Sequence, residues 1–217
     1  MACLILSLQN EDDNLARMGN SKKQDLTPQL LAFAKSLGIG DAKLLKADQV
    51  IIEERFRNLC AELPCPNFGT SINCPPHSMT PGQFQELVKG FTLVLAFKFD
   101  FPVEAVQGTE RREATLLLHE TTAAIEHHAR SLGFEHARGY SSGACKSTFC
   151  SEHRDCAALQ NGGRCRHPDK ARPSLSGMGV NWHELSRTLD WMMHKDEIGS
   201  QIQKSETIMM AGLVFLE

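Results

Sequence analysis

The sequence contains no long hydrophobic run: none of its apolar segments approaches the roughly 18 residues that a membrane-spanning helix requires. It also has no large excess of charge, since 23 Lys and Arg stand against 26 Asp and Glu for a net charge of −3. Proteins that bind nucleic acid usually carry a basic surface. We therefore expect neither a membrane protein nor a nucleic-acid-binding protein.

Motifs of several common catalytic sites are also missing. The sequence has no P-loop, no G-x-G-x-x-G after a predicted strand, and no H-E-x-x-H. His119, Glu120, His127 and His128 share one predicted helix. Adjacent helical residues point about 100° apart, so these side chains do not form a ligand set. We interpret them as part of a solvated helix face.

The chain is rich in cysteine, with eight residues, and its apolar fraction of 41% is sufficient for an ordinary core. The first residues lack the basic region and the long apolar segment of a signal peptide. We therefore expect a cytoplasmic protein. In that reducing compartment, clustered cysteines indicate metal or redox chemistry rather than disulfides.

Residues 1–25 are predicted to form an N-terminal tail, and residues 26–217 a single cysteine-rich domain. Periodicity and helix-start signals predict helices and strands in alternation. The predicted helices are 27–37, 80–87, 109–132 and 182–194, and the predicted strands are 47–55, 91–99, 134–140 and 208–216. This pattern favours an α+β fold, with α/β as the alternative, in which helices pack on a small mixed, ferredoxin-like sheet. Two cysteine-rich loops, 56–80 and 141–181, interrupt it.

The two loops carry seven of the eight cysteines. The first loop contains three, Cys60, Cys65 and Cys74, and Cys74 is followed by Pro-Pro-His77. The second loop contains four: Cys145, Cys150, Cys156 and Cys165. Cys3 lies in the tail and is interpreted as an incidental thiol.

Thiolates are soft ligands that select zinc, copper(I) or iron–sulfur centres. Zinc sites usually contain short C-x2–4-C pairs, and neither loop has a C-x2-C. The wider gaps favour a larger iron–sulfur cluster, although they match neither common ferredoxin spacing. Zinc and inert thiols stay open as alternatives. Four cysteines in the second loop are a full set for a 4Fe–4S cluster, whereas the first loop would need a further ligand, for which His77 is a candidate, or would keep one iron open.

Basic residues crowd the last cysteine: Arg164, Arg166, His167, Lys170 and Arg172. They are typical of a phosphate or RNA contact, but they would equally offset the negative charge of several thiolates around a cluster. We favour charge compensation.

These motifs resemble an uncharacterised prokaryotic family of predicted metal-binding proteins, over residues 27–217. The resemblance is carried by Cys65-Pro with Gly69, by Cys74-Pro-Pro-His77, and by the stretch from Cys165-Arg-His-Pro to Ala-Arg-Pro-Ser174. It implies that Cys60, Cys65 and Cys74 are ligands of one site, and that Cys145, Cys150, Cys156 and Cys165 are ligands of another. Two features depart from the family pattern: the four-residue gaps are wider, and Leu175-Ser-Gly-Met-Gly stands where an acidic residue is usual.

Three functional hypotheses follow. The first is an iron–sulfur protein with one or two 4Fe–4S clusters that serves electron transfer or activates a partner redox enzyme. The second is an enzyme that binds a small molecule at an open iron of the three-cysteine site. The third is a zinc-stabilised interaction module.

Overall fold

The computed structural model describes residues 26–217 except for 64, 161 and 192–205. The predicted N-terminal tail and Cys3 therefore lie outside the described residues. Helices and strands follow in the order α2 (Thr27–Ser36), β1 (Asp41–Lys46), α3 (Glu54–Glu62), α4 (Pro81–Val88), β2 (Leu93–Pro102), α5 (Val103–Gln107), α6 (Arg111–Ser131), β3 (Arg138–Ser141), α7 (Cys145–Phe149), α8 (Trp182–Thr188) and β4 (Thr207–Leu216). Short 3-10 helices are η1 (Ala47–Gln49), η2 (Ala157–Leu159) and η3 (Ser176–Met178).

The four strands form one antiparallel sheet in the order β1-β2-β4-β3. The two central strands pair along their whole length, from Leu93 opposite Leu216 to Pro102 opposite Thr207. In β2, residues 94–97 are all fully buried. A continuously apolar strand is typical of a sheet that is covered on both faces.

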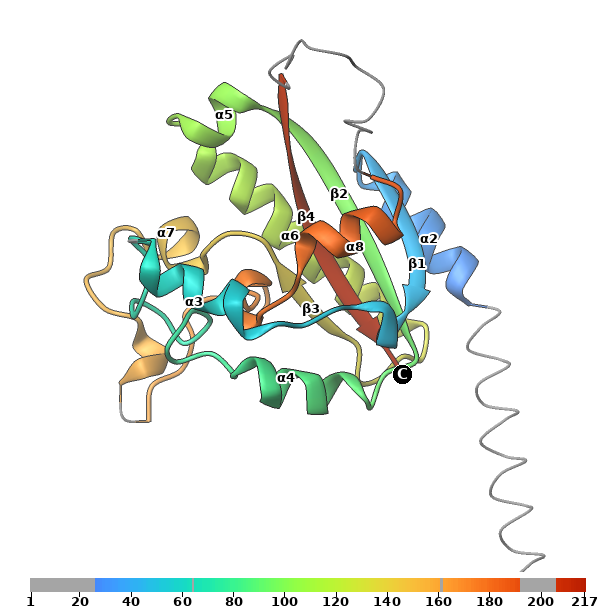
Figure 1. Cartoon of the computed structure of the whole chain (residues 1–217), viewed down its shortest axis with the longest axis horizontal. Coiled ribbons are helices and arrows are strands. Elements are labelled where there is room, and N and C mark those ends of the chain that lie inside the picture. Colours follow the sequence, from blue (N-terminus) through green and yellow to red (C-terminus); the bar gives the residue numbers. More distant parts are fainter. Residues whose placement is uncertain (1–25, 64, 161, 192–205) are drawn as a thin grey trace, which may run out of the picture.

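Helices do cover both faces of the sheet (Figure 1). On one face, α2 and α6 contribute Leu30, Leu118 and Ile125 to a core that includes Phe97. On the other face, α4, α8 and η3 pack a second core in which the ring of Phe84 lies against those of Tyr140 and Phe215. None of the helices in the described part of the chain combines the length and apolar character needed to span a bilayer.

The α+β prediction is confirmed, but two of its details are corrected. The sheet of the described residues is antiparallel rather than mixed. The ferredoxin-like arrangement is not confirmed either, because the strands and helices do not follow the βαββαβ order of that fold.

The predicted strand over 47–55 is wrong. Its apolar residues Val50 and Ile52 are buried, which explains the alternating pattern, but only Ile52 forms a β-bridge, to Val180. The chain then enters α3, so Cys60 lies on a helix.

The other predicted elements are present, with shifted ends. Helix α8 ends at Thr188, earlier than predicted, and Asp190 has a positive φ of 51°, which is incompatible with a continuing helix. Within α6, Leu118 is fully buried, whereas its neighbour Leu117 is 41% exposed.

Candidate metal centre

The three cysteines of the first loop are held by helix α3 and the turn before α4. Cys60 lies in the last turn of α3, Cys65 follows it, and Cys74 precedes a cis Pro75–Pro76 bond. The guanidinium of Arg57 fixes this arrangement: it donates to the carbonyl oxygens of residues 76, 78, 79 and 177 and to the hydroxyl of Ser78. One side chain therefore ties the cysteine-bearing helix to the Pro-Pro turn and to η3.

The second group of cysteines begins where the chain leaves the sheet at β3. Cys145 is the first residue of α7, and Cys150 follows the last. Two contacts fasten α7 to α6: the hydroxyl of Thr148 donates to that of Thr115, and Arg112 Nε donates to the carbonyl of Thr148.

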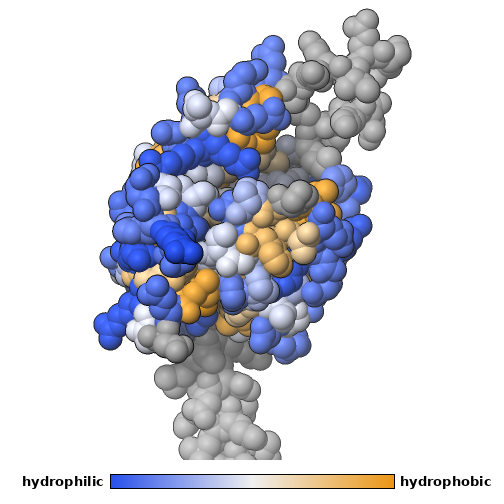
Figure 2. Space-filling model, turned by 90° about the vertical axis from the view of Figure 1, so that its left-hand side faces the viewer, coloured by the Kyte–Doolittle hydropathy of each residue, from blue (hydrophilic) through white to orange (hydrophobic). Residues whose placement is uncertain are grey.

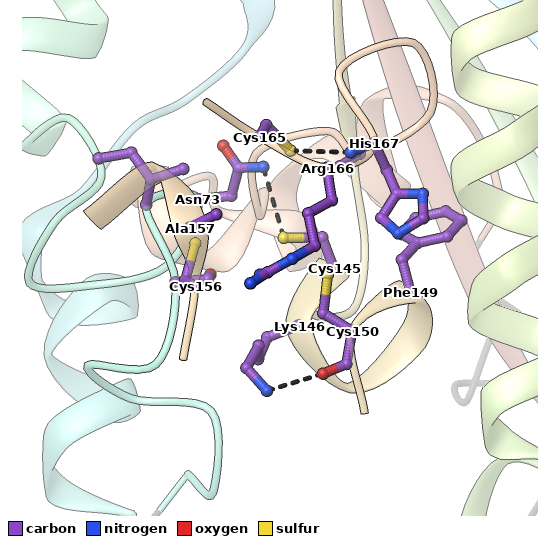
Figure 3. Close-up of a pocket in the computed structure, with 13 residues that line it drawn as sticks. Asn73, Cys145, Lys146, Phe149, Cys150, Cys156, Ala157, Cys165, Arg166 and His167 are labelled. Carbon is purple, nitrogen blue, oxygen red and sulfur yellow. Dashed lines mark hydrogen bonds between the residues drawn. The ribbon is translucent and has the colours of Figure 1, made fainter. Parts of the chain in front are cut away.

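All four cysteines of the second loop line one small cavity, together with Asn73 of the first loop (Figure 3). The cavity measures about 20 Å³, which is room for one water molecule or one ion. Lys146 supports the loop around it, since its Nζ donates to the carbonyl oxygens of Cys150 and His153. The fold thus brings the four cysteines of the second loop to one cavity, and their role as metal ligands stays a prediction.

The two groups of thiols are neighbours. Asn73 Nδ2 donates to Cys145 Sγ over 3.4 Å, and the backbone amide of Ser174 donates to the carbonyl of Asn73 over 3.1 Å. The buried hydroxyl of Ser71 lies beside both Cys74 and Cys145, where it opposes the rise in pKa that burial causes in both thiols. Residues of the loops at 56–80 and 141–181, far apart in sequence, therefore lie side by side in the fold.

Burial is the main influence on these thiols. It raises the pKa of Cys74 to about 11, with smaller contributions in the same direction from Cys145, Cys65 and Cys60. Burial also raises the pKa of Cys145, and the hydrogen bond from Asn73 opposes it. Thiols that influence one another across both loops lie close in space, and a positive charge among them would stabilise their ionised forms.

Hydrogen-bond donors aimed at sulfur fit a bound metal centre. Besides Asn73, the backbone N–H of His167 points at Cys165 Sγ, 3.4 Å away. The hydroxyl of Ser71 has no well-aligned hydrogen-bond partner among the described residues. A buried polar atom without a partner costs free energy, which sulfur atoms of a bound centre would recover. In the part of the chain that the structure describes, no three Cys, His, Asp or Glu side chains already stand in a geometry that could hold a metal ion.

The structure separates the basic residues of the second loop into two kinds. Arg154, Arg164 and Arg166 are exposed. Arg172 is instead buried in an ion pair with Glu126 of α6, so its role is to anchor the loop. The expectation that Arg172 belongs to the charge-compensating patch is therefore corrected.

Two histidines lie near the cysteines. The ring of His167 stacks on that of Phe149, with the ring centroids 5.4 Å apart, and both residues line the cavity (Figure 3). His77 is exposed, and its backbone amide, rather than its ring, contacts Cys74 by donating to the carbonyl oxygen. Its role as a ligand stays a prediction.

The interpretation of His119 as part of a solvated helix face is wrong. His119 is fully buried, its Nδ1 accepts the backbone N–H of Arg172, and its ring meets the ring of Phe149 edge-on. Burial, together with the nearby charge of Arg172, lowers its pKa to about 4, so the ring is neutral. His119 supports the segment that follows Cys165.

Residues 139–143 read Gly-Tyr-Ser-Ser-Gly, the G-x-S-x-G spacing of a hydrolase nucleophile elbow. The geometry is different here. Ser141 is completely buried, its backbone amide donates to the carbonyl of Pro173, and its hydroxyl donates to the carbonyl of Ser142. It is a strand residue of the edge that holds the cysteine loop.

Sequence reasoning did not single out Ser71 or Asn73. The available signal was their position: Asn73 directly precedes Cys74, and Ser71 lies three residues before it. Their roles depend on contact with Cys145, which lies 72 residues further along the chain than Asn73.

Comparison with known proteins gives one match. No curated protein and no solved structure matches the chain. A family described as predicted metal-binding protein (DUF2284) matches residues 43–216, a range that includes all seven clustered cysteines. The chain therefore belongs to this family of predicted metal-binding proteins.

Proposed function

We propose that this protein is an iron–sulfur protein whose seven clustered cysteines hold one or two 4Fe–4S clusters and that it serves electron transfer or activates a partner redox enzyme. One observation carries the proposal: two distant loops bring all seven thiols to one end of the molecule, with donors from Asn73 and His167 directed at sulfur. Such a number of thiols exceeds what a single zinc ion requires.

The surrounding residues support this chemistry. When bound, such a cluster takes up and releases single electrons, at a potential that hydrogen bonds to sulfur and solvent exposure adjust. Asn73 and the amide of His167 would stabilise the negative charge on Cys145 and Cys165. The exposed Arg164 and Arg166 would offset the remaining charge from outside.

The face around the centre suits a redox partner. Five exposed large apolar side chains flank the cysteines of both loops: Leu59, Leu63, Phe68, Ile72 and Leu159. Figure 2 shows this face, with apolar patches among hydrophilic residues. Because basic side chains accompany them, the surface favours an acidic redox protein as partner. Substituting Leu63 and Phe68 together should weaken the binding of such a partner.

The three-cysteine group suggests a second role as an enzyme. Cys60, Cys65 and Cys74 are one thiol short of a full cluster set, so an iron there could bind a small molecule. The exposed position of His77 leaves room for such a ligand.

A specific observation favours zinc as an alternative. The cavity among the four thiols of the second loop has room for a single ion rather than for a larger cluster. A zinc-stabilised interaction module would therefore need a smaller rearrangement of these thiols than a cluster would.

Anaerobic purification of the full chain distinguishes these functions. The iron–sulfur proposal expects a brown protein that contains iron and acid-labile sulfide. Cys74→Ser and Cys156→Ser, made separately, should each remove about half of the iron if two centres exist and all of it if the loops share one. Cys3→Ser is the matched control and should retain all of it. A colourless, folded, zinc-loaded protein would overturn the proposal.

A further inference from the structure

A second cavity, of about 410 Å³, opens beside the edge strand β3, and none of the seven clustered cysteines lines it. Its walls come from the second half of α6, from β3 and from residues 168–173. Its volume lies within the range of small-molecule sites. It is thus a candidate site separate from the cavity among the four cysteines.

Positive charge exceeds negative charge around this cavity. Arg130, Arg138 and Arg172 line it, against the carboxylates of Glu126 and Asp169. Both oxygens of Glu126 are occupied: Oε1 pairs with Arg130, and Oε2 accepts from Arg172. Two guanidinium groups, those of Arg130 and Arg172, therefore pair with the single carboxylate of Glu126.

Arg138 adds a further positive charge to the lining of this cavity. Its side chain is exposed and lies beside the hydroxyl of Tyr140, with which it hydrogen-bonds. Burial raises the pKa of Tyr140 to about 12. A tyrosine hydroxyl is protonated at neutral pH even without this shift, and it can donate a hydrogen bond. His127 adds a ring at the rim, whose Nε2 lies 3.4 Å from Arg172.

We propose that this cavity binds a small oxyanion, with the guanidinium of Arg138 as its principal charged contact and the hydroxyl of Tyr140 as a second donor. Arginine presents several N–H groups in a planar fork that matches carboxylate and phosphate oxygens. The ligand class is therefore a small phosphate or carboxylate compound. This inference does not depend on the identity of the metal, because the cavity has its own walls and charges.

Isothermal titration of the purified full chain tests the proposal. Inorganic phosphate is one probe and succinate the other, at constant ionic strength, with sodium chloride as the blank. Saturable binding at a ratio of one is expected for at least one probe. Arg138→Gln should weaken it about tenfold or more, because a charge-assisted contact is lost. Arg187→Gln, an exposed arginine on α8, is the matched control and should leave the affinity unchanged.

The outcomes separate this site from the metal centre. Cys156 lines the other cavity. The Cys156→Ser protein should therefore bind the anion with the same affinity as the unchanged protein. If neither probe binds saturably, or if Arg138→Gln binds as tightly as the unchanged chain, the proposal is wrong. Preference between the two probes identifies which oxyanion the cavity favours.

Discussion

The carboxylate of Glu126 accepts a hydrogen bond from Nε of Arg172, and this buried ion pair joins helix α6 to the segment that follows Cys165. Both side chains are less than one-tenth exposed. The same Oε2 atom of Glu126 accepts the backbone N–H of Gly139 over 3.0 Å. One carboxylate thus closes the free edge of β3 and holds the second cysteine loop against the sheet.

Glu126→Gln should therefore destabilise the fold strongly. The substitution leaves the guanidinium of Arg172 buried without its counter-charge, which costs about 3–5 kcal/mol. Urea unfolding of the purified protein measures the loss. Glu120→Gln is the matched control: Glu120 lies on the same helix and pairs with Lys170, but both are substantially exposed, so the expected change is within about 1 kcal/mol. Equal effects of the two substitutions would show that the buried pair has no special role.

Gly139 should not tolerate a side chain. A Cβ atom at this position would lie 2.7 Å from Glu126 Oε2 and 2.8 Å from Thr122 Cγ2. Gly139→Ala is therefore expected to displace the carboxylate and to cost about 1–3 kcal/mol in the free energy of unfolding. Gly82→Ala, on α4, meets no atom within 4 Å and should leave the stability within about 1 kcal/mol of the original. A Gly139→Ala protein as stable as the Gly82→Ala protein would contradict the prediction.

These contacts explain which features the sequence predicts. The long helix, the buried strand β2 and the final strand are specified by local apolar patterns, so they were predictable. The grouping of cysteines was predictable as well, because Cys65, Cys74 and Cys150 stand in loops with close spacing. By contrast, the burial of His119 and Arg172 depends on their meeting across 53 residues. No local pattern encodes such a contact, so charged residues near Cys165 looked like surface residues.

The buried His119 should make the stability depend on pH. Burial lowers its pKa from 6.5 to about 4, so the unfolded chain binds one more proton than the folded chain between these values. The contribution of His119 to the free energy of unfolding is fully present above pH 6.5 and is lost as the pH falls toward 4. Between pH 7 and pH 5, the expected loss from this group is about 2 kcal/mol.

Urea unfolding of His119→Asn at both pH values isolates this contribution. Asparagine keeps an acceptor for the amide of Arg172 but has no titratable group, so the variant should lose about 2 kcal/mol less than the unchanged protein on acidification. His183→Asn removes an exposed histidine and should preserve the original pH dependence. An unaltered pH dependence in His119→Asn would mean that folding does not lower the pKa of His119.

Arg57 should control the order of the first cysteine group. Its five hydrogen bonds reach the Pro-Pro turn and η3, so Arg57→Ala leaves several carbonyl oxygens without a donor. We expect a loss of roughly 2 kcal/mol in unfolding free energy. Burial raises the pKa of the Cys60 thiol and the charge of Arg57 opposes this rise, so Arg57→Ala should also slow the reaction of Cys60 with an aromatic disulfide reagent. Arg55→Ala is the control, because Arg55 is largely exposed and makes local contacts, an ion pair with Glu53 and a cation–π contact with Phe56. It should leave the rate at Cys60 unchanged. If Arg57→Ala also leaves that rate unchanged, the charge of Arg57 does not act on Cys60, and Arg57 contributes to stability alone.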